Sequence, residues 1–209
     1  MLFERHQRIL FIGDSITDSD RAGSARPFGN GYVRMVRDFM LARYPEYNLT
    51  FINRGVGGDT VRNLAARWER DVIAERPDWL AVMIGINDVW RHFAYNVSEA
   101  VPLDEYGSTL RRLLQRAREA TGAQLILMQP FMIEPNRQNP MRQLMDVYGS
   151  QLELIATEFG APLVRTQAAF DAALAVTRGQ FWSSDQIHPG GPGHAVIALA
   201  VLNTIGFVL

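Results

Sequence analysis

Short apolar runs alternate with longer segments of helical spacing along the whole chain. Five runs are almost continuously apolar, which is typical of strands that helices cover on both faces of a parallel sheet. These predicted strands are 9–13, 49–53, 79–84, 125–129 and 162–165. Three segments between them, 61–72, 106–117 and 141–159, repeat apolar residues at the spacing of a helix stripe. Asp59 or Thr60 is expected to cap the start of the first of these helices, and Asp104 the start of the second. Gly160 and Pro162 are expected to end the third.

This strand–helix alternation predicts the α/β class, as a three-layer α/β/α sandwich around a five-stranded parallel sheet. The chain has no internal repeat, low-complexity run or break in composition, so 1–209 is expected to form one domain. In such a sheet, ligands bind beyond the carboxyl ends of the strands. The segments expected at that edge are 13–18 (GDSITD), 53–60 (NRGVGGDT) and 85–88 (GIND), with 185–189 (DQIHP) free to reach it.

Composition narrows the possible chemistry. The formal net charge of -1 gives no support for nucleic-acid binding or for a polybasic membrane surface. The chain contains no cysteine, which excludes thiol nucleophiles, disulfides and thiolate metal sites. It also contains no lysine, which excludes Schiff-base chemistry and the P-loop lysine. A covalent intermediate would therefore need a hydroxyl, a carboxylate or a histidine.

No stretch approaches the ~20 apolar residues of a membrane-spanning helix, and the first apolar run, 9–12, is too brief for a signal-peptide core. We therefore expect a cytoplasmic location with no membrane association.

Ser15 is the strongest candidate nucleophile, because it follows a buried strand directly at the sheet edge. A serine hydroxyl needs a base within hydrogen-bond reach, and His188 is the best candidate. Asp185, in the same loop, could accept a hydrogen bond from the other ring nitrogen and so orient the base. The structural alternatives are that Asp14 and Ser15 merely cap a helix and that His188 stabilises a turn.

The ester oxyanion would need fixed donors, for which the N–H groups of Ser15 and Gly58 and the side-chain amide of Asn87 are candidates. The alternatives are a tight glycine turn around Gly58 and an ordinary turn role for Asn87. A metal site formed by Asp185, His188 and His194 is conceivable, but further ligands are not apparent in the sequence.

These motifs together resemble the SGNH hydrolases, also called the GDSL esterase/lipase family. Ser15 in GDSITD, Gly58 in NRGVGGDT, Asn87 in GIND and His188 in DQIHP occur in the order of that family's blocks. The resemblance implies a flavodoxin-like SGNH fold, with Ser15 as nucleophile and Asp185 and His188 as the other triad members. It also implies an oxyanion hole formed by Ser15, Gly58 and Asn87.

Three longer stretches resemble bacterial intracellular acetyl xylan esterases of this superfamily. They are TVRNLAARWERDVIAERPDWLAVMIGINDVWR, PFMIEPNRQNPMRQLMDVYG and TQAAFD. This resemblance implies the removal of acetyl groups from xylo-oligosaccharides. Asp14, Trp90 and Trp182 are the candidate substrate contacts. Phe93 and Tyr95 follow Trp90, and such aromatic side chains suit stacking on sugar rings, although a loop core is the alternative.

The leading hypothesis is thus a serine esterase that deacetylates carbohydrates through an acyl-enzyme, without a metal ion or other cofactor. A broad short-chain carboxylesterase or thioesterase, similar to a lysophospholipase, is the alternative enzyme. A catalytically silent sugar-binding module is the alternative outside enzymes. A small-molecule ester is the expected partner.

The segment 195–202 (AVIALAVL) is apolar around its whole circumference, which predicts a homo-oligomer. Related esterases are often homo-oligomeric.

Overall fold

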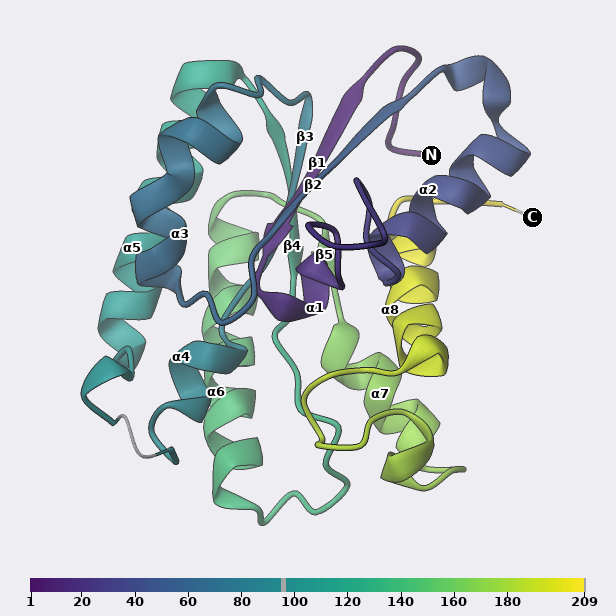
Figure 1. Cartoon of the computed structure of the whole chain (residues 1–209). Helices are drawn as coiled ribbons and strands as arrows, with labels where there is room; N and C mark the ends of the chain where they lie inside the picture. Colours follow the sequence, from purple (N-terminus) through teal and green to yellow (C-terminus); the bar gives the residue numbers. More distant parts are fainter. Residues whose placement is uncertain (95–96, 209) are drawn as a thin grey trace.

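A sheet of five parallel strands forms the centre of the molecule (Figure 1) in a computed structural model that describes residues 1–94 and 97–208. The spatial order of the strands is β2-β1-β3-β4-β5. Their bounds are β1 (Arg8–Gly13), β2 (Thr50–Gly55), β3 (Trp79–Met83), β4 (Gln124–Met128) and β5 (Leu163–Val164). Each strand lies within a residue or two of its predicted position, so the five-stranded parallel sheet is confirmed.

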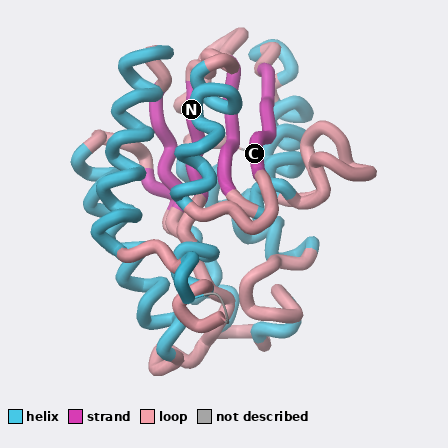
Figure 2. Tube along the Cα trace, turned by 60° about the vertical axis from the view of Figure 1, so that its left-hand side comes forward, coloured by secondary structure: helices cyan, strands magenta, loops and turns pink. Residues whose placement is uncertain are grey.

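Helices cover both faces of this sheet, which confirms the three-layer sandwich (Figures 1 and 2). One layer contains α3 (Val61–Trp68), α5 (Leu103–Thr121) and α6 (Pro140–Glu158). The other contains α2 (Tyr32–Arg43), α7 (Thr166–Leu174) and α8 (Gly191–Thr204). The short helices α1 (Ser15–Asp18) and α4 (Ile86–Trp90) lie near the carboxyl ends of the strands. A π-helical turn, Glu69–Ile73, extends α3, and 3-10 turns occupy Pro45–Tyr47, Val97–Glu99 and Gly179–Phe181.

The burial pattern of the strands follows from these layers. Every residue of β3 is buried, and so is every residue of β1 after Arg8, because helices pack on both faces. The edge strand β2 alternates instead between buried and more exposed positions. The buried apolar residues form one contiguous core that runs from the first strand to α8.

The residue at the start of one helix is as the sequence predicted, and that at the start of another differs from the prediction. Thr60 precedes α3, and its N–H donates to Asn63 Oδ1 over 2.9 Å, as in a capping box. The second predicted helix begins at Leu103 rather than at Asp104, directly after Pro102. Asp104 therefore lies in the first turn of α5, where a negative charge is favourable near the helix amino end.

The final helix, α8, is buried on one face only. Ile197, Ala198, Val201 and Leu202 are at most 3% exposed, whereas Leu199 is 55% exposed. Among the described residues, no helix combines the length and the apolar character that crossing a bilayer requires.

The strand order brings the predicted functional segments together. From β1 the chain passes to β2 on one side and later to β3 on the other, so the order reverses at β1. The turns that follow these three strands consequently meet at one edge of the sheet, where open α/β sheets bind ligands. The loop that precedes α8 passes close to α1 at the same edge (Figure 1).

Candidate active site

Ser15 is the first residue of α1 and lies at the carboxyl edge of the sheet. Asp14 precedes it and accepts the N–H of Ile16 over 3.0 Å, which satisfies one free donor at the helix start. A Cβ atom on Gly13 would lie 2.2 Å from the carbonyl oxygen of Met83, so a side chain does not fit there. The chain can therefore turn from strand to helix close to β3 and present Ser15 at the edge.

Ser15, His188 and Asp185 form a continuous hydrogen-bonded chain. Ser15 Oγ lies 2.9 Å from His188 Nε2, and His188 Nδ1 lies 2.7 Å from Asp185 Oδ2. A carboxylate accepts only, so Nδ1 must carry the hydrogen and Nε2 is left free to accept the serine proton. This arrangement is suited to nucleophilic attack by the serine with the histidine as general base.

The Asp185 carboxylate is fixed by the loop itself. Its Oδ1 accepts the backbone N–H groups of Ile187 and His188 over 3.0 and 2.8 Å, and the hydroxyl of Ser183 over 3.0 Å. Partial burial would raise the pKa of Asp185, but the hydrogen bonds from the His188 side chain and from these groups hold it well below its ordinary value. Asp185 is thus a permanent anion that can stabilise an imidazolium.

The turn after β2 lies against the nucleophile and carries a candidate oxyanion donor. A Cβ atom built on Gly57 would be 3.9 Å from Ser15 Cβ. Gly58 has φ +82, a conformation that disfavours any residue with a side chain, although the space around it is open. The buried Asn87 donates from Nδ2 to the Asp59 carbonyl oxygen over 3.0 Å. An amide nitrogen has two hydrogens, so the second can serve an oxyanion.

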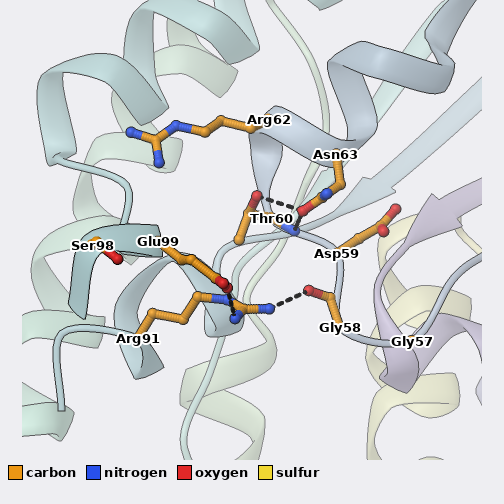
Figure 3. Close-up of a pocket in the computed structure, with 9 residues that line it drawn as sticks. All are labelled: Gly57, Gly58, Asp59, Thr60, Arg62, Asn63, Arg91, Ser98 and Glu99. Carbon is orange, nitrogen blue, oxygen red and sulfur yellow. Dashed lines mark hydrogen bonds and ion pairs between the residues drawn. The ribbon is translucent and has the colours of Figure 1, made fainter. Parts of the chain in front are cut away.

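Helix α4 holds the same turn at two further points. The Val61 N–H donates to Asp88 Oδ1 over 3.0 Å, and Arg91 Nη2 donates to the Gly58 carbonyl oxygen over 3.2 Å (Figure 3). Together with the bond from Asn87, these contacts fix the peptide groups on both sides of Asp59. The turn that carries the Gly58 N–H is therefore held from its following side before any substrate arrives.

Buried titratable groups surround the site. Burial raises the pKa of Asp14 to about 7 and that of Asp88 to about 7. Asp88 Oδ2 is buried and has no hydrogen-bond partner among the described residues. Burial lowers the pKa of His194 to about 4, so this ring is neutral at physiological pH.

One guanidinium joins the nucleophile strand to the oxyanion turn. Arg67 of α3 donates to the Gly13 carbonyl oxygen over 3.0 Å and to the Arg54 carbonyl oxygen over 2.7 Å. It also donates to the carboxylates of Asp59 over 2.6 Å and Asp71 over 2.9 Å. Because the side chain is only 8% exposed, the charge depends on these partners. The rigid fork of an arginine suits this arrangement, in which two carbonyls and two carboxylates are bound at once.

Arg67, Asp88 and Arg91 were not identified from the sequence. A signal for Arg67 was present, because it lies on the buried stripe of α3 between Leu64 and Trp68. A charged residue in an apolar stripe indicates a paired, buried charge. The other two contacts link segments far apart in the sequence, and no local pattern points to them.

The predicted substrate contacts have different surroundings. Asp14 is 1% exposed and caps α1, which is the structural role considered beside the functional one. Trp90 is 43% exposed at the end of α4. Trp182 is half-buried against the core and contacts Phe181 edge-to-face. Tyr95 lies outside the described residues.

The metal alternative finds no support in the geometry. His188 uses Nδ1 to contact Asp185, and His194 Nδ1 instead accepts the Tyr32 N–H over 3.3 Å. Within 1–94 and 97–208, no three His, Asp or Glu side chains converge as a metal site would require.

Comparison with known proteins agrees with this geometry. Residues 11–196 match the family model of the GDSL-like Lipase/Acylhydrolase family. An acetylxylan esterase of Geobacillus stearothermophilus is 46% identical over 208 residues, which covers 96% of this chain and 94% of that protein.

Solved structures extend this likeness to the whole fold. The crystal structure of the esterase Axe2 from Geobacillus stearothermophilus superposes with a TM-score of 0.95 at 45% identity, covering 100% of this chain and 98% of that one. LAE5, an alpha/beta hydrolase enzyme from the metagenome of Lake Arreo, gives a TM-score of 0.95 at 41% identity, covering 100% and 99%. Variants of Axe2 described as catalytic mutants replace a serine, an aspartate and a histidine.

Proposed function

The chain belongs to the family of GDSL-like lipases and acylhydrolases, and from that premise we propose that it removes acetyl groups from short acetylated xylo-oligosaccharides. It is a carboxylic ester hydrolase of the SGNH type. The full-length likeness to an acetylxylan esterase supports the substrate class. The observation on which the chemistry rests is the pair of hydrogen bonds that joins Ser15 to His188 and His188 to Asp185.

In the first half-reaction, Ser15 Oγ attacks the carbonyl carbon of the acetyl ester while its proton moves to His188 Nε2. The negative charge that develops on the carbonyl oxygen is stabilised by the N–H groups of Ser15 and Gly58 and by the Asn87 amide. When the tetrahedral intermediate collapses, the C–O bond to the sugar breaks. The departing sugar oxygen takes the proton from His188, and the acetyl group stays on Ser15.

In the second half-reaction, a water molecule attacks the acetyl-serine and gives a proton to His188. Collapse of this second intermediate breaks the bond to Ser15 Oγ, which takes the proton back, and acetate leaves. Asp185 holds the His188 ring in the orientation and tautomer that both steps need, and its charge stabilises the transient imidazolium.

The test of substrate class is acetate release from acetylated xylobiose, compared with the hydrolysis of 4-nitrophenyl acetate, butyrate and octanoate. We expect turnover of acetylated xylobiose and a steep fall in kcat/KM as the acyl chain lengthens. Equal or better hydrolysis of the octanoate would favour a broad esterase or thioesterase instead.

Two controls make this test specific. Ser15→Ala should lose nearly all acetate release while keeping its fold, because the covalent step has no substitute. A fluorophosphonate probe should label the unaltered protein at Ser15 and leave the variant unlabelled. Absence of labelling at Ser15 in the unaltered protein would favour the sugar-binding module.

We also propose that the chain is a homo-oligomer in which a second copy covers the exposed side of α8. The support is an apolar surface around Leu199, flanked by Val196 and Ala200, beside a depression of ≈ 420 Å³. Light scattering at micromolar concentration tests this, and a stable mass near 23.6 kDa would contradict it. The cytoplasmic location expected from the sequence stays a prediction.

A further inference from the structure

A cavity of ≈ 390 Å³, lined by polar side chains and two glycines, opens beside the oxyanion turn, on the side of α3 and α4 (Figure 3). The turn 57–60 forms one wall of it, Arg62 and Asn63 of α3 form the top in this view, and Arg91, Ser98 and Glu99 lie opposite. Gly57 also lies against the nucleophile, since a Cβ on it would be 3.9 Å from Ser15 Cβ. The cavity therefore shares the turn 57–60 with the reaction centre.

The walls of this cavity are held in place without a ligand. Arg62 makes two hydrogen bonds of 2.6 Å to the Glu105 carboxylate, in the bidentate geometry that arginine favours. Arg91 forms an ion pair with Glu99 and donates to the Gly58 carbonyl oxygen. These side chains have little rotamer freedom left to lose when a ligand binds, which favours affinity.

The chemistry of the lining selects for a neutral ligand rich in hydroxyl groups. The two guanidinium groups are each paired with a glutamate, so the cavity offers no uncompensated charge to an anionic ligand. Its side chains are charged, amide or hydroxyl groups, and none is aliphatic or aromatic. Guanidinium, carboxylate and hydroxyl groups together can donate to and accept from a sugar's hydroxyls.

The polar side chains and the volume of the cavity also indicate which part of an ester substrate would enter it. An acetyl group ends in a single apolar methyl, which cannot use the hydrogen-bonding groups of this lining and leaves most of ≈ 390 Å³ unfilled. The volume instead falls in the range of about 300–1,000 Å³ that is usual for small-molecule sites. The alcohol side of the ester is therefore the better occupant.

We propose that this cavity is a glycosyl subsite, which binds the sugar unit next to the acetylated one through hydrogen bonds to Arg62 and its neighbours. The inference rests on the proposed function, because it assumes a carbohydrate ester. It adds that residues of α3 and of the 97–99 turn make the enzyme prefer an acetylated oligosaccharide to an acetylated monosaccharide.

The test compares Arg62→Met with a matched control, Arg111→Met. Arg111 of α5 also forms an ion pair, with Glu158 over 2.6 Å, and both pairs are similarly exposed, with Arg62 at 42% and Arg111 at 36%. For each protein, kcat/KM is measured on acetylated xylobiose and on 4-nitrophenyl acetate, which has no second sugar. We expect Arg62→Met to lower the ratio of the two values about tenfold, as the loss of a hydrogen bond to a charged group would.

The control variant should leave this ratio unchanged. A second variant, Ser98→Trp, places bulk in the cavity and should lower the ratio in the same direction. An unchanged ratio in both Arg62→Met and Ser98→Trp would overturn the glycosyl subsite.

Failure of the subsite and failure of the proposed function give different results. If the unaltered protein releases no acetate from xylobiose, the substrate class itself is wrong. If it does release acetate, and prefers acetylated xylobiose no more than acetylated xylose, only the subsite is wrong.

Discussion

The two halves of the active site are built in different ways. The nucleophile and the oxyanion turn are held by contacts between segments far apart in the sequence, such as Arg67 to Gly13 and Asn87 to Asp59. The side chains of Asp185 and His188 are instead positioned by contacts within a few residues, and each is 48% exposed. Their loop is joined to the 133–134 segment through Gln186, which binds Glu134 and accepts the Ile133 N–H. Within the described part of the chain, the hydrogen bond between Ser15 and His188 is what joins the catalytic side chains of the two halves.

This difference corresponds to the tasks of the two halves. Oxyanion donors act by being fixed in advance where charge develops, and burial in a rigid network provides that. A general base must instead accept and return protons, and a partly solvated loop permits this without leaving a charge buried. We therefore expect substitutions in the buried half to act through geometry and substitutions in the loop to act through protonation and tautomer.

Among substitutions that keep the Ser15 nucleophile, the largest expected effect comes from the loop that carries Asp185 and His188. In Asp185→Asn, the Ile187 and His188 N–H groups would keep the amide oxygen at the Oδ1 position, so the NH₂ group would face His188 Nδ1. The ring must then carry its hydrogen on Nε2, where it can no longer accept the Ser15 proton. We expect kcat to fall on the order of a thousandfold or more with an unchanged fold. Activity near that of the unaltered protein would show that Asp185 does not orient the base.

Asn87→Ala tests the buried half directly and should have the next largest effect. The amide gains strength as negative charge develops on the substrate, so its loss acts on the transition state. We expect kcat to fall roughly a hundredfold, with a smaller change in KM. If KM alone changes, Asn87 positions the substrate and does not stabilise the oxyanion.

The same difference between local and distant contacts explains what the sequence could predict. The strands were predictable because their apolar runs reflect burial on both faces, and Asp185 and His188 stand out because they share one short loop. Arg67, Asp88 and Arg91 were not identified, because their partners are assembled only when α3 and α4 pack against the strand ends. The start of α5 was misplaced, because Pro102 rather than Asp104 takes the position before the helix.

Two buried arginines, Arg67 and Arg142, allow a matched test of the buried half, with a smaller expected effect on kcat than that of Asn87→Ala. Arg67 joins the nucleophile strand to the oxyanion turn. Arg142 of α6 binds Asp146, Asp171 and the Glu134 carbonyl oxygen, and so holds neither the nucleophile strand nor the oxyanion turn. Lysine keeps the charge and loses the fork in either position. We expect Arg67→Lys to lower kcat about tenfold, because small displacements of reacting groups are costly. Arg142→Lys should destabilise the fold and change kcat much less.

The readout that separates these roles is kcat measured together with the free energy of unfolding. Both variants are expected to lose stability, on the order of 1–3 kcal/mol. A fall in kcat of the same size in both variants would mean that Arg67 supports the fold in general and does not position the oxyanion turn.

The smallest expected effect concerns stability alone and involves His194, which joins α8 to the segment after the nucleophile helix. Its Nδ1 accepts the Tyr32 N–H, Nε2 lies 3.4 Å from Ser19 Oγ, and burial lowers its pKa from 6.5 to about 4. Between these values the unfolded chain binds a proton that the folded chain does not, so the free energy of unfolding decreases as the pH is lowered. An asparagine oxygen can accept the same N–H without titrating. Between pH 7 and pH 4.5, the free energy of unfolding of His194→Asn should therefore fall by roughly 2 kcal/mol less than that of the unaltered protein, as urea unfolding would measure.

The control for this prediction is His6→Asn, which replaces an exposed histidine. The buried carboxyls titrate in both proteins, so the difference between the two pH profiles isolates His194. Parallel pH profiles for the unaltered protein and His194→Asn would show that this ring is not held neutral by the fold.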